Sequence, residues 1–387
     1  MKDNNQRVVM DCLRKCSPIS RRDLAIQIGL TSATITNIVN SLMNDDMIIE
    51  TGLAAGERGR RPILLDLNAD FCNVVGVAVT GNQMDIVICD FKASVKTLRK
   101  IPFDMSEPSD VTIDRMIEGI RASMRTANVT VEDVAGIGLA VPGPIDYENG
   151  IVLNPPNLPE WKNVRLREII ANEFGIPVYL DKESNAAALA EYYFGAASGH
   201  KTVFCFNVYE VGVGGGLLRT GNIFHGYRDN ACEIGHITLD MNGPLCSCGN
   251  YGCLESMLRG SALTDQALRG LNEGKQSVLK KDSLSLRALL DAADEGDELA
   301  ASVVRKAAEY ASVAIGNIIC MYSPEMIILG GDLPLSSKLF TEQTAVAVHS
   351  RSYPAHCKDI EIHASELGSL SGPLGAVALV FEGMLKY

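Results

Sequence analysis

The chain has 387 residues, 47% of them hydrophobic and 21% charged, with a formal net charge of −12. This composition is ordinary for a globular protein of two or three domains, and so acidic a balance argues against a protein that coats nucleic acid over its whole surface. No apolar run reaches the roughly 18 residues of a membrane span, and no signal-peptide pattern begins the chain, so we expect a cytoplasmic protein that does not enter membranes.

The charge is unevenly distributed along the chain. Residues 1–66 carry 9 basic and 8 acidic side chains, a net charge of about +1, which leaves about −13 for the remainder. We therefore expect a small N-terminal domain at 1–66 and a larger, acidic part that follows it.

Residues 17–50 predict two short helices joined by a tight turn and followed by a strand. Ser20, with Asp23 three residues later, fits a capping box at the start of the first helix, and Gly29 ends that helix. Thr31 or Ser32 can cap the second helix. Its apolar residues have the spacing of a single buried face: Ile35, Ile38, Val39, Leu42 and Met43.

The opposite face of this second helix is small and polar, as in a recognition helix that lies in the major groove of DNA. We assign base contacts to Ser32, Ala33, Thr34, Thr36, Asn37 and Asn40. A small helical bundle with a solvated face is the alternative. The face lacks Arg and Lys, the commonest readers of guanine, whereas Asn pairs with adenine and methyl groups contact thymine. We therefore predict double-stranded operator DNA with an A/T-rich palindrome, read by a dimer.

The segment from Met47 to Leu67 alternates like a β-hairpin, and its loop is basic and glycine-rich. Arg58, Arg60 and Arg61 lie in that loop. Such a loop beside a recognition helix predicts a wing that contacts phosphates or the minor groove. The alternative is a run of solvated charges.

From about Asn68 onwards, β-rich segments alternate with helical stretches, which predicts an α/β fold. The expected strands are 74–80, 84–91, 134–141, 202–208 and 325–331. Glycine clusters at strand ends, as in VGVGGGLL and LGGD, indicate either backbone that approaches a phosphate or close packing.

Three cysteines, Cys246, Cys248 and Cys253, lie within eight residues. Cysteines stay reduced in the cytoplasm, so a cluster this tight favours a metal site over disulfides.

This cluster, preceded by CEIGH at 232–236, resembles the signature of the ROK family of repressors, open reading frames and sugar kinases. The segments PGPIDYENGIVLNPPNLPEW, SNAAALAEYYFGAASG, NIICMYSPEMIILGGD and GPLGAVALVFEG follow in the order of the family, and the N-terminal winged helix matches its repressor branch. The resemblance covers nearly the whole chain. It implies a winged helix-turn-helix followed by a two-lobed actin-like or hexokinase-like ATPase fold.

The resemblance implies that His236, Cys246, Cys248 and Cys253 bind one structural Zn²⁺. Four such ligands complete a tetrahedron and leave no position for a catalytic water, so the metal would brace a loop. The alternative is a set of unliganded buried thiols. The family pattern gives Cys232 no ligand role, and we interpret it as a core residue.

The positions at which kinases of this family hold nucleotide are altered. The first phosphate loop, usually Asp-x-Gly-Gly-Thr, here offers Ala78, Thr80, Gly81 and Asn82, and so lacks the metal-facing carboxylate and one glycine. The second loop, usually Gly-Thr-Gly, reads Glu210-Val211-Gly212, which puts an anion where a phosphate would bind.

The position of the catalytic base is altered as well. Where the family has Asn-Asp-Ala-Asn, this chain has Lys182, Glu183, Ser184 and Asn185, so the longer Glu183 replaces the Asp. A displacement of about 1 Å can cost about 10²-fold in rate. Together the changes argue against phosphoryl transfer, and we expect no catalytic residue and no enzyme activity.

The sugar contacts of the family are better preserved. The resemblance assigns hydroxyl contacts to Asn154, Asn157, Lys182, Glu183, Glu233, His236 and Glu255. Converging donors and acceptors of this kind suit a polyol. His236 is claimed by both the metal and the sugar. The alternatives are surface or loop-capping acids and, for the two asparagines, residues that shape a proline-rich loop.

Lys182 differs from the Asn that the family often has, because an ammonium can only donate hydrogen bonds. We favour a pair between Lys182 and Glu183 that neutralises the altered catalytic site. The alternative is that Lys182 binds an anionic group, which would make the effector a phosphorylated or acidic sugar.

These observations predict a sugar-responsive DNA-binding repressor of carbohydrate-metabolism genes that works as a homodimer or dimer of dimers. Its expected parts are a winged helix-turn-helix at 1–66, a first lobe at 67–190 plus 372–387, and a second lobe with the zinc loop at 191–371. An active sugar kinase and a sensor that binds another protein are the alternatives.

Overall fold

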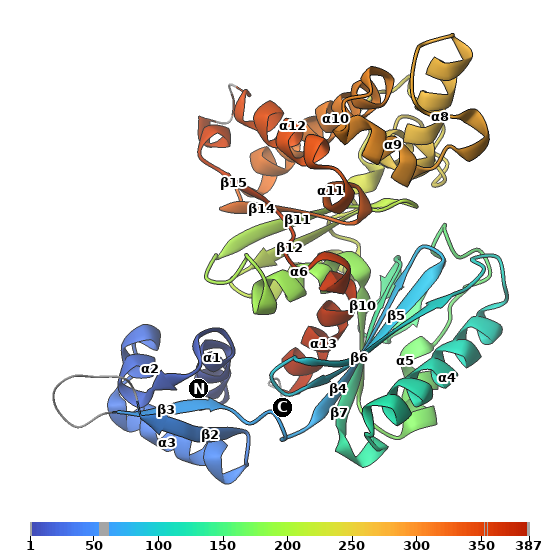
Figure 1. Ribbon diagram of the computed structural model, residues 1–387. Helices are drawn as coiled ribbons and strands as arrows, with labels where there is room; N and C mark the ends of the chain where they lie inside the picture. The colour runs from blue at the N-terminus through green and yellow to red at the C-terminus, as the bar shows by residue number, and fades with distance from the viewer. Residues whose placement is uncertain (1, 54–61, 352, 354, 385–387) are drawn as a thin grey trace.

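The chain begins with a winged helix-turn-helix. The computed structural model describes residues 2–53, 62–351, 353 and 355–384 (Figure 1). The elements of this first domain are α1 (Lys2–Cys16), β1 (Ile19–Ser20), α2 (Arg21–Ile28), α3 (Ser32–Asn44), β2 (Ile48–Leu53) and β3 (Ile63–Leu67). Its three-stranded sheet has the order β1-β3-β2, and β3 is antiparallel to both neighbours.

The helix ends follow from the residues that the sequence singled out. The Ser20 side chain accepts a hydrogen bond from the Asp23 amide and begins α2, and Gly29 ends α2 in the left-handed conformation at φ 74°. The Thr31 side chain caps α3 through the Thr34 amide. The predicted apolar face of α3 is buried, except that Met43 is half-buried.

Helix α1 was not predicted. It buries Val9, Met10 and Leu13 completely, so a helical spacing was present in the sequence but lies in a short and largely polar segment. The predicted hairpin is confirmed by the antiparallel pairing of β2 with β3. The loop residues Arg58, Arg60 and Arg61 lie outside the described residues.

Two lobes follow, and each contains a five-stranded sheet. The first lobe contains β4 (Asn73–Thr80), β5 (Gln83–Asp90), β6 (Val95–Pro102), α4 (Ser109–Ala127), β7 (Val134–Val141), β8 (Ile145–Asp146), β9 (Ile151–Val152), α5 (Leu166–Phe174), β10 (Val178–Lys182) and α6 (Glu183–Phe194). The second contains β11 (Thr202–Val208), β12 (Val213–Arg219), β13 (Asn222–Ile223), α7 (Glu255–Leu258), α8 (Gly260–Asn272), α9 (Leu286–Asp294), α10 (Glu298–Tyr322), β14 (Met326–Gly330), α11 (Asp332–Ser336), α12 (Lys338–His349) and β15 (Glu361–Ala364). The C-terminal helix α13 (Ser371–Met384) returns to the first lobe.

The two sheets have the same topology. Their strand orders are β6-β5-β4-β7-β10 and β13-β12-β11-β14-β15, and in each the first strand of the lobe has an antiparallel neighbour on one side and a parallel neighbour on the other. The five predicted strands are present as β4, β5, β7, β11 and β14, which confirms the expected two-lobed α/β fold. No helix in the described part of the chain combines the length and the apolar character that a membrane span requires.

Helices α6 and α13 lie between the two sheets (Figure 1). Helix α13 packs on the first sheet and on α6, and α6 in turn packs on β11 and β12 of the second sheet. The packing is too close for side chains at some points: a Cβ on Gly138 would lie 1.8 Å from the Ala376 carbonyl oxygen, and one on Gly216 would lie 2.5 Å from that of Ser184. The glycines of β12 thus favour the close-packing alternative for that cluster.

The winged helix-turn-helix is anchored to this helix pair through α1. The Arg14 guanidinium lies over the rings of Phe381 and Phe91, at 3.5 and 4.6 Å from their centroids, and donates a hydrogen bond to the Phe91 carbonyl oxygen. The Lys15 ammonium lies 3.4 Å from the centroid of Tyr192 in α6. One continuous apolar core includes residues of α1, β3 and α13. The winged helix-turn-helix is therefore packed against the first lobe and is not joined to it by a linker alone.

We predict that Arg14→Met loosens this anchor. It removes a stacked cation and a hydrogen bond, together worth about 1–3 kcal/mol. The expected results are a lower melting temperature in differential scanning fluorimetry and faster proteolysis in the connection at 68–72. Arg22→Met, at an exposed position of α2, is the matched control. Identical melting and cleavage in the two variants would show that the stacking does not hold the domains together.

Candidate functional site

A cleft lies between the lobes and gathers most of the predicted sugar contacts, with a volume of about 790 Å³ when the open solvent at its mouth is included. Its lining includes Asn157, Lys182, Glu183, Glu233, His236 and Glu255. Asn154 is exposed and is not among the lining residues. Three short segments, 79–81, 142–143 and 211–215, also line the cleft.

Lys182 is bonded across the cleft, but not to Glu183 as predicted. Its ammonium donates hydrogen bonds to Glu233 Oε1 at 2.6 Å and to the Ala231 carbonyl oxygen at 2.9 Å. The partner is Glu233 because the loop after β13 folds back onto the first lobe, where Asp229 also accepts a hydrogen bond from the Tyr147 amide. Only 4% of the Lys182 side chain is exposed, so this charge is neutralised internally rather than by solvent.

Glu183 begins α6 at the floor of the cleft. Its Oε2 atom is buried and has no hydrogen-bond partner among the described residues. Burial raises the pKa of Glu183 to about 8, and the charges of Glu233 and Glu255 add to the rise while Lys182 opposes it. At neutral pH this carboxyl is therefore mostly protonated, and it can donate a hydrogen bond as well as accept one.

Glu255 and Asn157 contact the backbone of the 211–213 segment from opposite lobes. Glu255 Oε2 accepts a hydrogen bond from the Val213 amide at 3.1 Å, and Asn157 Nδ2 donates to the Val211 carbonyl oxygen at 3.5 Å. A Cβ on Gly212 would lie 2.8 Å from Glu255 Oε2, so the absence of a side chain at Gly212 lets the Glu255 carboxylate lie close to this backbone segment. Both lobes therefore shape this wall of the cleft.

The structure adds lining residues that the sequence analysis did not select. Tyr209, Ser184 and the Pro142–Gly143 segment line the cleft. Ser184 and Pro142–Gly143 fall in segments that resemble the family, whereas Tyr209, before the glycine run, had no such signal. Cys232, interpreted as core, is half-buried and lines the cleft. The reason is its loop, in which Cys232 itself has a left-handed backbone at φ 62°.

The altered nucleotide positions have distinct surroundings. Ala78 is 1% exposed and belongs to an apolar cluster with α6 and α13, so a carboxylate there would be buried among alkyl groups. Glu210 is exposed, and its amide donates to Asp332 Oδ2 at 2.9 Å. Thr80 and Gly81 line the cleft, whereas Asn82 lines a neighbouring cavity.

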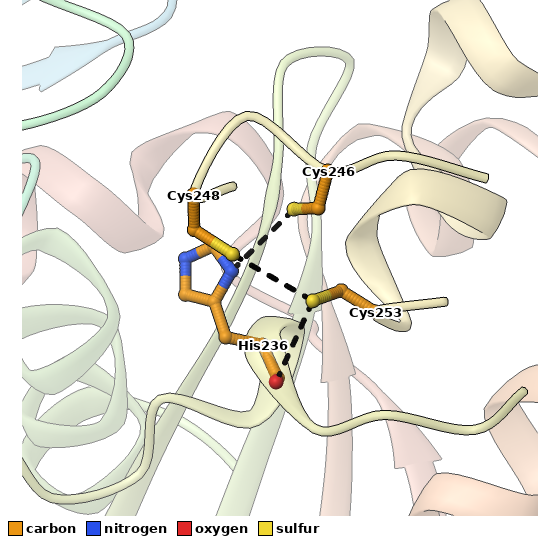
Figure 2. Close-up of side chains that lie close together, drawn as sticks. All are labelled: His236, Cys246, Cys248 and Cys253. Carbon is orange, nitrogen blue, oxygen red and sulfur yellow. Dashed lines mark hydrogen bonds between the residues drawn. The ribbon is translucent and has the colours of Figure 1, made fainter. Parts of the chain in front are cut away.

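Four potential ligand atoms converge beside the cleft, from His236, Cys246, Cys248 and Cys253 (Figure 2). All of these atoms lie within 4.8 Å of one another. His236 Nδ1 is 3.7 Å from Cys246 Sγ, and the sulfur atoms of Cys248 and Cys253 are 3.7 Å apart. A tetrahedron of Zn–S bonds of about 2.3 Å places its sulfurs about 3.8 Å apart, so the donor set and its spacing fit zinc.

This geometry separates the two roles suggested for His236. Figure 2 shows the Nδ1 side of the ring turned toward the cysteines and the Nε2 side turned away from them. His236 also lines the cleft. One histidine can therefore serve a metal with Nδ1 and a ligand with Nε2.

The segment 236–253, which carries the four potential ligands and is called the metal loop below, also positions Glu255. Gly252 adopts a left-handed backbone at φ 67°, and a Cβ there would lie 1.5 Å from the Asp240 carbonyl oxygen. The loop then leads through Cys253 directly into α7, which begins at Glu255. Ser247, between two of the cysteines, donates a hydrogen bond to Glu255 Oε1 at 3.2 Å.

The predicted base-contacting residues lie on one exposed side of α3. Ser32, Ala33, Asn37 and Asn40 are exposed, and Thr34 and Thr36 are half-buried. Arg21, which the sequence analysis did not select, donates a hydrogen bond to Asn40 Oδ1 at 3.0 Å. The signal for Arg21 in the sequence was a basic residue at the first position of α2, close to the recognition helix.

Comparisons with known proteins agree with this architecture. Residues 74–382 match the ROK family, and residues 2–49 match the winged helix-turn-helix DNA-binding family. The xylose repressor of Caldicellulosiruptor bescii is 29% identical over 100% of this chain and 98% of its own length. A ROK family transcriptional regulator described as a homologue of the Escherichia coli MLC protein has a TM-score of 0.83 and 28% identity, with 100% of this chain and 98% of that chain covered.

A ROK family glucokinase from Streptomyces griseus has the same fold, with a TM-score of 0.73 and 24% identity. It covers 80% of this chain and 100% of its own. The xylose repressor and the MLC homologue both match over the full length of this chain, and they are a repressor and a transcriptional regulator rather than kinases, in agreement with the expectation that this chain is not an enzyme.

We predict about one zinc ion per chain in purified protein, measured by elemental analysis. Cys248→Ser removes a ligand, so the zinc content should fall well below that of the wild type and the melting temperature should drop, because metal binding and local folding are coupled. Cys232→Ser, at a cysteine outside the ligand cluster, is the matched control and should retain the metal. Wild-type protein without stoichiometric zinc would contradict the assignment.

Proposed function

This chain belongs to the ROK family and is a transcriptional regulator with an N-terminal winged helix-turn-helix, and from that premise we propose that it is a repressor that a neutral sugar releases from its operator. The sugar binds in the cleft between the lobes, and no phosphate is transferred. The repressor works in the cytoplasm, where its DNA is.

One connection carries this proposal: α6 begins in the cleft and ends under the DNA-binding domain. Glu183 is its first residue, and Tyr192, two residues from its end, lies beneath Lys15 of α1. A sugar that shifts Glu183 acts on the same rigid helix that supports the winged helix. Ligand binding can change DNA affinity only if the two forms differ in sugar affinity, and this coupling must be reciprocal.

The arrangement of charge supports a neutral sugar rather than a sugar phosphate. The ammonium of Lys182 is already bonded to Glu233 and Ala231, and the cleft contains two further carboxyl groups, Glu183 and Glu255. A phosphate would have to displace an existing charge pair and lie near acidic groups. Hydroxyl groups can instead bridge the carboxylates, the protonated Glu183 and the Asn157 amide.

The structural elements near the operator support the same function. The exposed side of α3, with Ser32, Ala33, Asn37 and Asn40, is assigned to the major groove, and Thr34 and Thr36 flank it. Its composition favours A/T base pairs. One winged helix reads few base pairs, so a dimer on a palindrome is the working unit.

We predict that a neutral sugar weakens operator binding by at least about 5-fold, the lower end of typical allosteric coupling. The measurement is fluorescence anisotropy with upstream DNA and a panel of neutral sugars with their phosphates, and the phosphates should have little effect. Glu255→Gln should keep DNA binding and lose most of the response. Glu160→Gln, at an exposed glutamate, is the control. A response to the phosphorylated sugar alone, or formation of ADP from ATP, would refute the proposal.

We also predict that Glu183→Gln stabilises the free protein increasingly as pH rises. The folded-state pKa of Glu183 is raised to about 8, so between its unfolded pKa and pH 8 folding must take up a proton, and stability relative to the Gln variant is lost over that range. The gain in melting temperature should be small near pH 5 and reach several degrees near pH 8. Glu160→Gln should show no such trend, and a pH-independent gain in Glu183→Gln would contradict the burial of a neutral carboxyl.

A further inference from the structure

A second cavity, of about 1080 Å³ when the open solvent at its mouth is included, adjoins the cleft on the side of α8 and α9. Its lining is Asn82, Met105, Asn157, Glu210, Val211, Arg259, Gly260, Ser261, Thr264, Leu284, Ser285 and Leu286. The cavity thus lies between the β4–β5 turn of the first lobe and helical segments of the second.

The two cavities share a boundary. Asn157 and Val211 line both, and the hydrogen bond between them spans the boundary. In the first lobe, two neighbouring residues line different cavities: Gly81 lines the cleft, and Asn82 lines the second cavity. A ligand longer than one sugar ring could therefore extend from the cleft past Asn157.

The second cavity is poorly suited to phosphate groups. Arg259 is the one cationic side chain in its described lining, and Glu210 offsets it. Two of its backbone amides are already used: the Glu210 amide donates to Asp332, and the Gly260 amide donates to the Glu210 carbonyl oxygen. A nucleotide would need several free donors and cations here.

The lining is instead suited to a neutral polyol. Hydroxyl and amide groups come from Ser261, Thr264, Ser285 and Asn82, and they alternate with the alkyl side chains of Met105, Leu284 and Leu286. Such a mixture offers hydrogen bonds to hydroxyls and apolar contact to the C–H faces of a ring. Arg259 adds guanidinium donors to this lining.

We propose that this cavity binds a second sugar unit, so that the effector is a neutral disaccharide or glycoside rather than a monosaccharide. The inference rests on the proposed function, because it extends the same cleft. The first ring occupies the cleft beside Glu183 and Glu255, and the second lies past Asn157 between the two lobes. An effector that contacts both lobes in both cavities favours their closure more than one ring can.

The test is isothermal titration calorimetry of the full-length protein with matched pairs of a monosaccharide and a disaccharide. The pairs are xylose and xylobiose, glucose and cellobiose, glucose and maltose, and N-acetylglucosamine and its β-1,4-linked disaccharide. We expect one disaccharide to bind at least about tenfold tighter than its monosaccharide, a difference of about 1.4 kcal/mol. Ser261→Trp should abolish that advantage and leave monosaccharide affinity unchanged, because Ser261 is exposed in the second cavity and outside the cleft.

Two further variants keep the test decisive. Asn82→Trp fills the same cavity from the opposite lobe and should reproduce the effect of Ser261→Trp. Ser302→Trp, at an exposed position of α10, is the control for added bulk and should bind like the wild type. A monosaccharide that binds and releases DNA while no disaccharide binds tighter would overturn only this inference. Failure of every sugar to bind would overturn the proposed function as well, and ATP that competes at the second cavity would overturn the assignment of that cavity.

Discussion

The close contact of α6 with α13, and of both with the two sheets, is the constraint on which the structure depends. A Cβ on Gly375 would lie 2.2 Å from the Ala186 carbonyl oxygen, so the two helices meet at their backbones rather than through long side chains. Interfaces this tight cannot deform gradually, because interiors are already close-packed. A displacement at one end of α6 must therefore be passed on as a shift of the whole helix. The winged helix-turn-helix is packed on this pair, so its placement follows from theirs.

The cleft shows how a site with several acidic groups stays compatible with a neutral ligand. Lys182 and Glu233 neutralise each other, and Glu183 is held mostly uncharged by burial. An isolated buried charge would cost several kcal/mol, so a pair and a protonated acid are the arrangement that the cleft can tolerate. The Lys182–Glu233 pair and the protonated Glu183 supply hydrogen-bond donors and acceptors without adding a net positive charge that would attract phosphate. The metal loop contributes to this order, because Ser247 and the start of α7 fix the carboxylate of Glu255.

Local signals in the sequence predicted the features that depend on few residues. The caps at Ser20 and Thr31, the strands and the cluster of three cysteines are set within short segments, so the chain reveals them directly. The addition of His236 to the cluster came from the family resemblance. The partner of Lys182 could not be predicted, because it depends on a loop about 50 residues away that folds back with left-handed residues at Arg228 and Asp229. Helix α1 was missed for a related reason. Its apolar face is short and is completed by the second domain.

The positions at which the resemblance places nucleotide bear on the proposal that one ligand occupies both cavities. In a phosphate loop, free amides and cations must wait for the ligand, at a cost in stability when the loop is empty. Here Asp332 accepts the hydrogen bond of the Glu210 amide, which belongs to the second loop, and Ala78 packs in an apolar cluster at the position where the family pattern has a carboxylate. That amide of the second loop is therefore satisfied without nucleotide. On the proposed function, the space beyond Asn157 needs no charge for a phosphate. Its hydroxyl and alkyl lining then suits a larger neutral ligand, whose binding energy would close the lobes instead of driving a reaction.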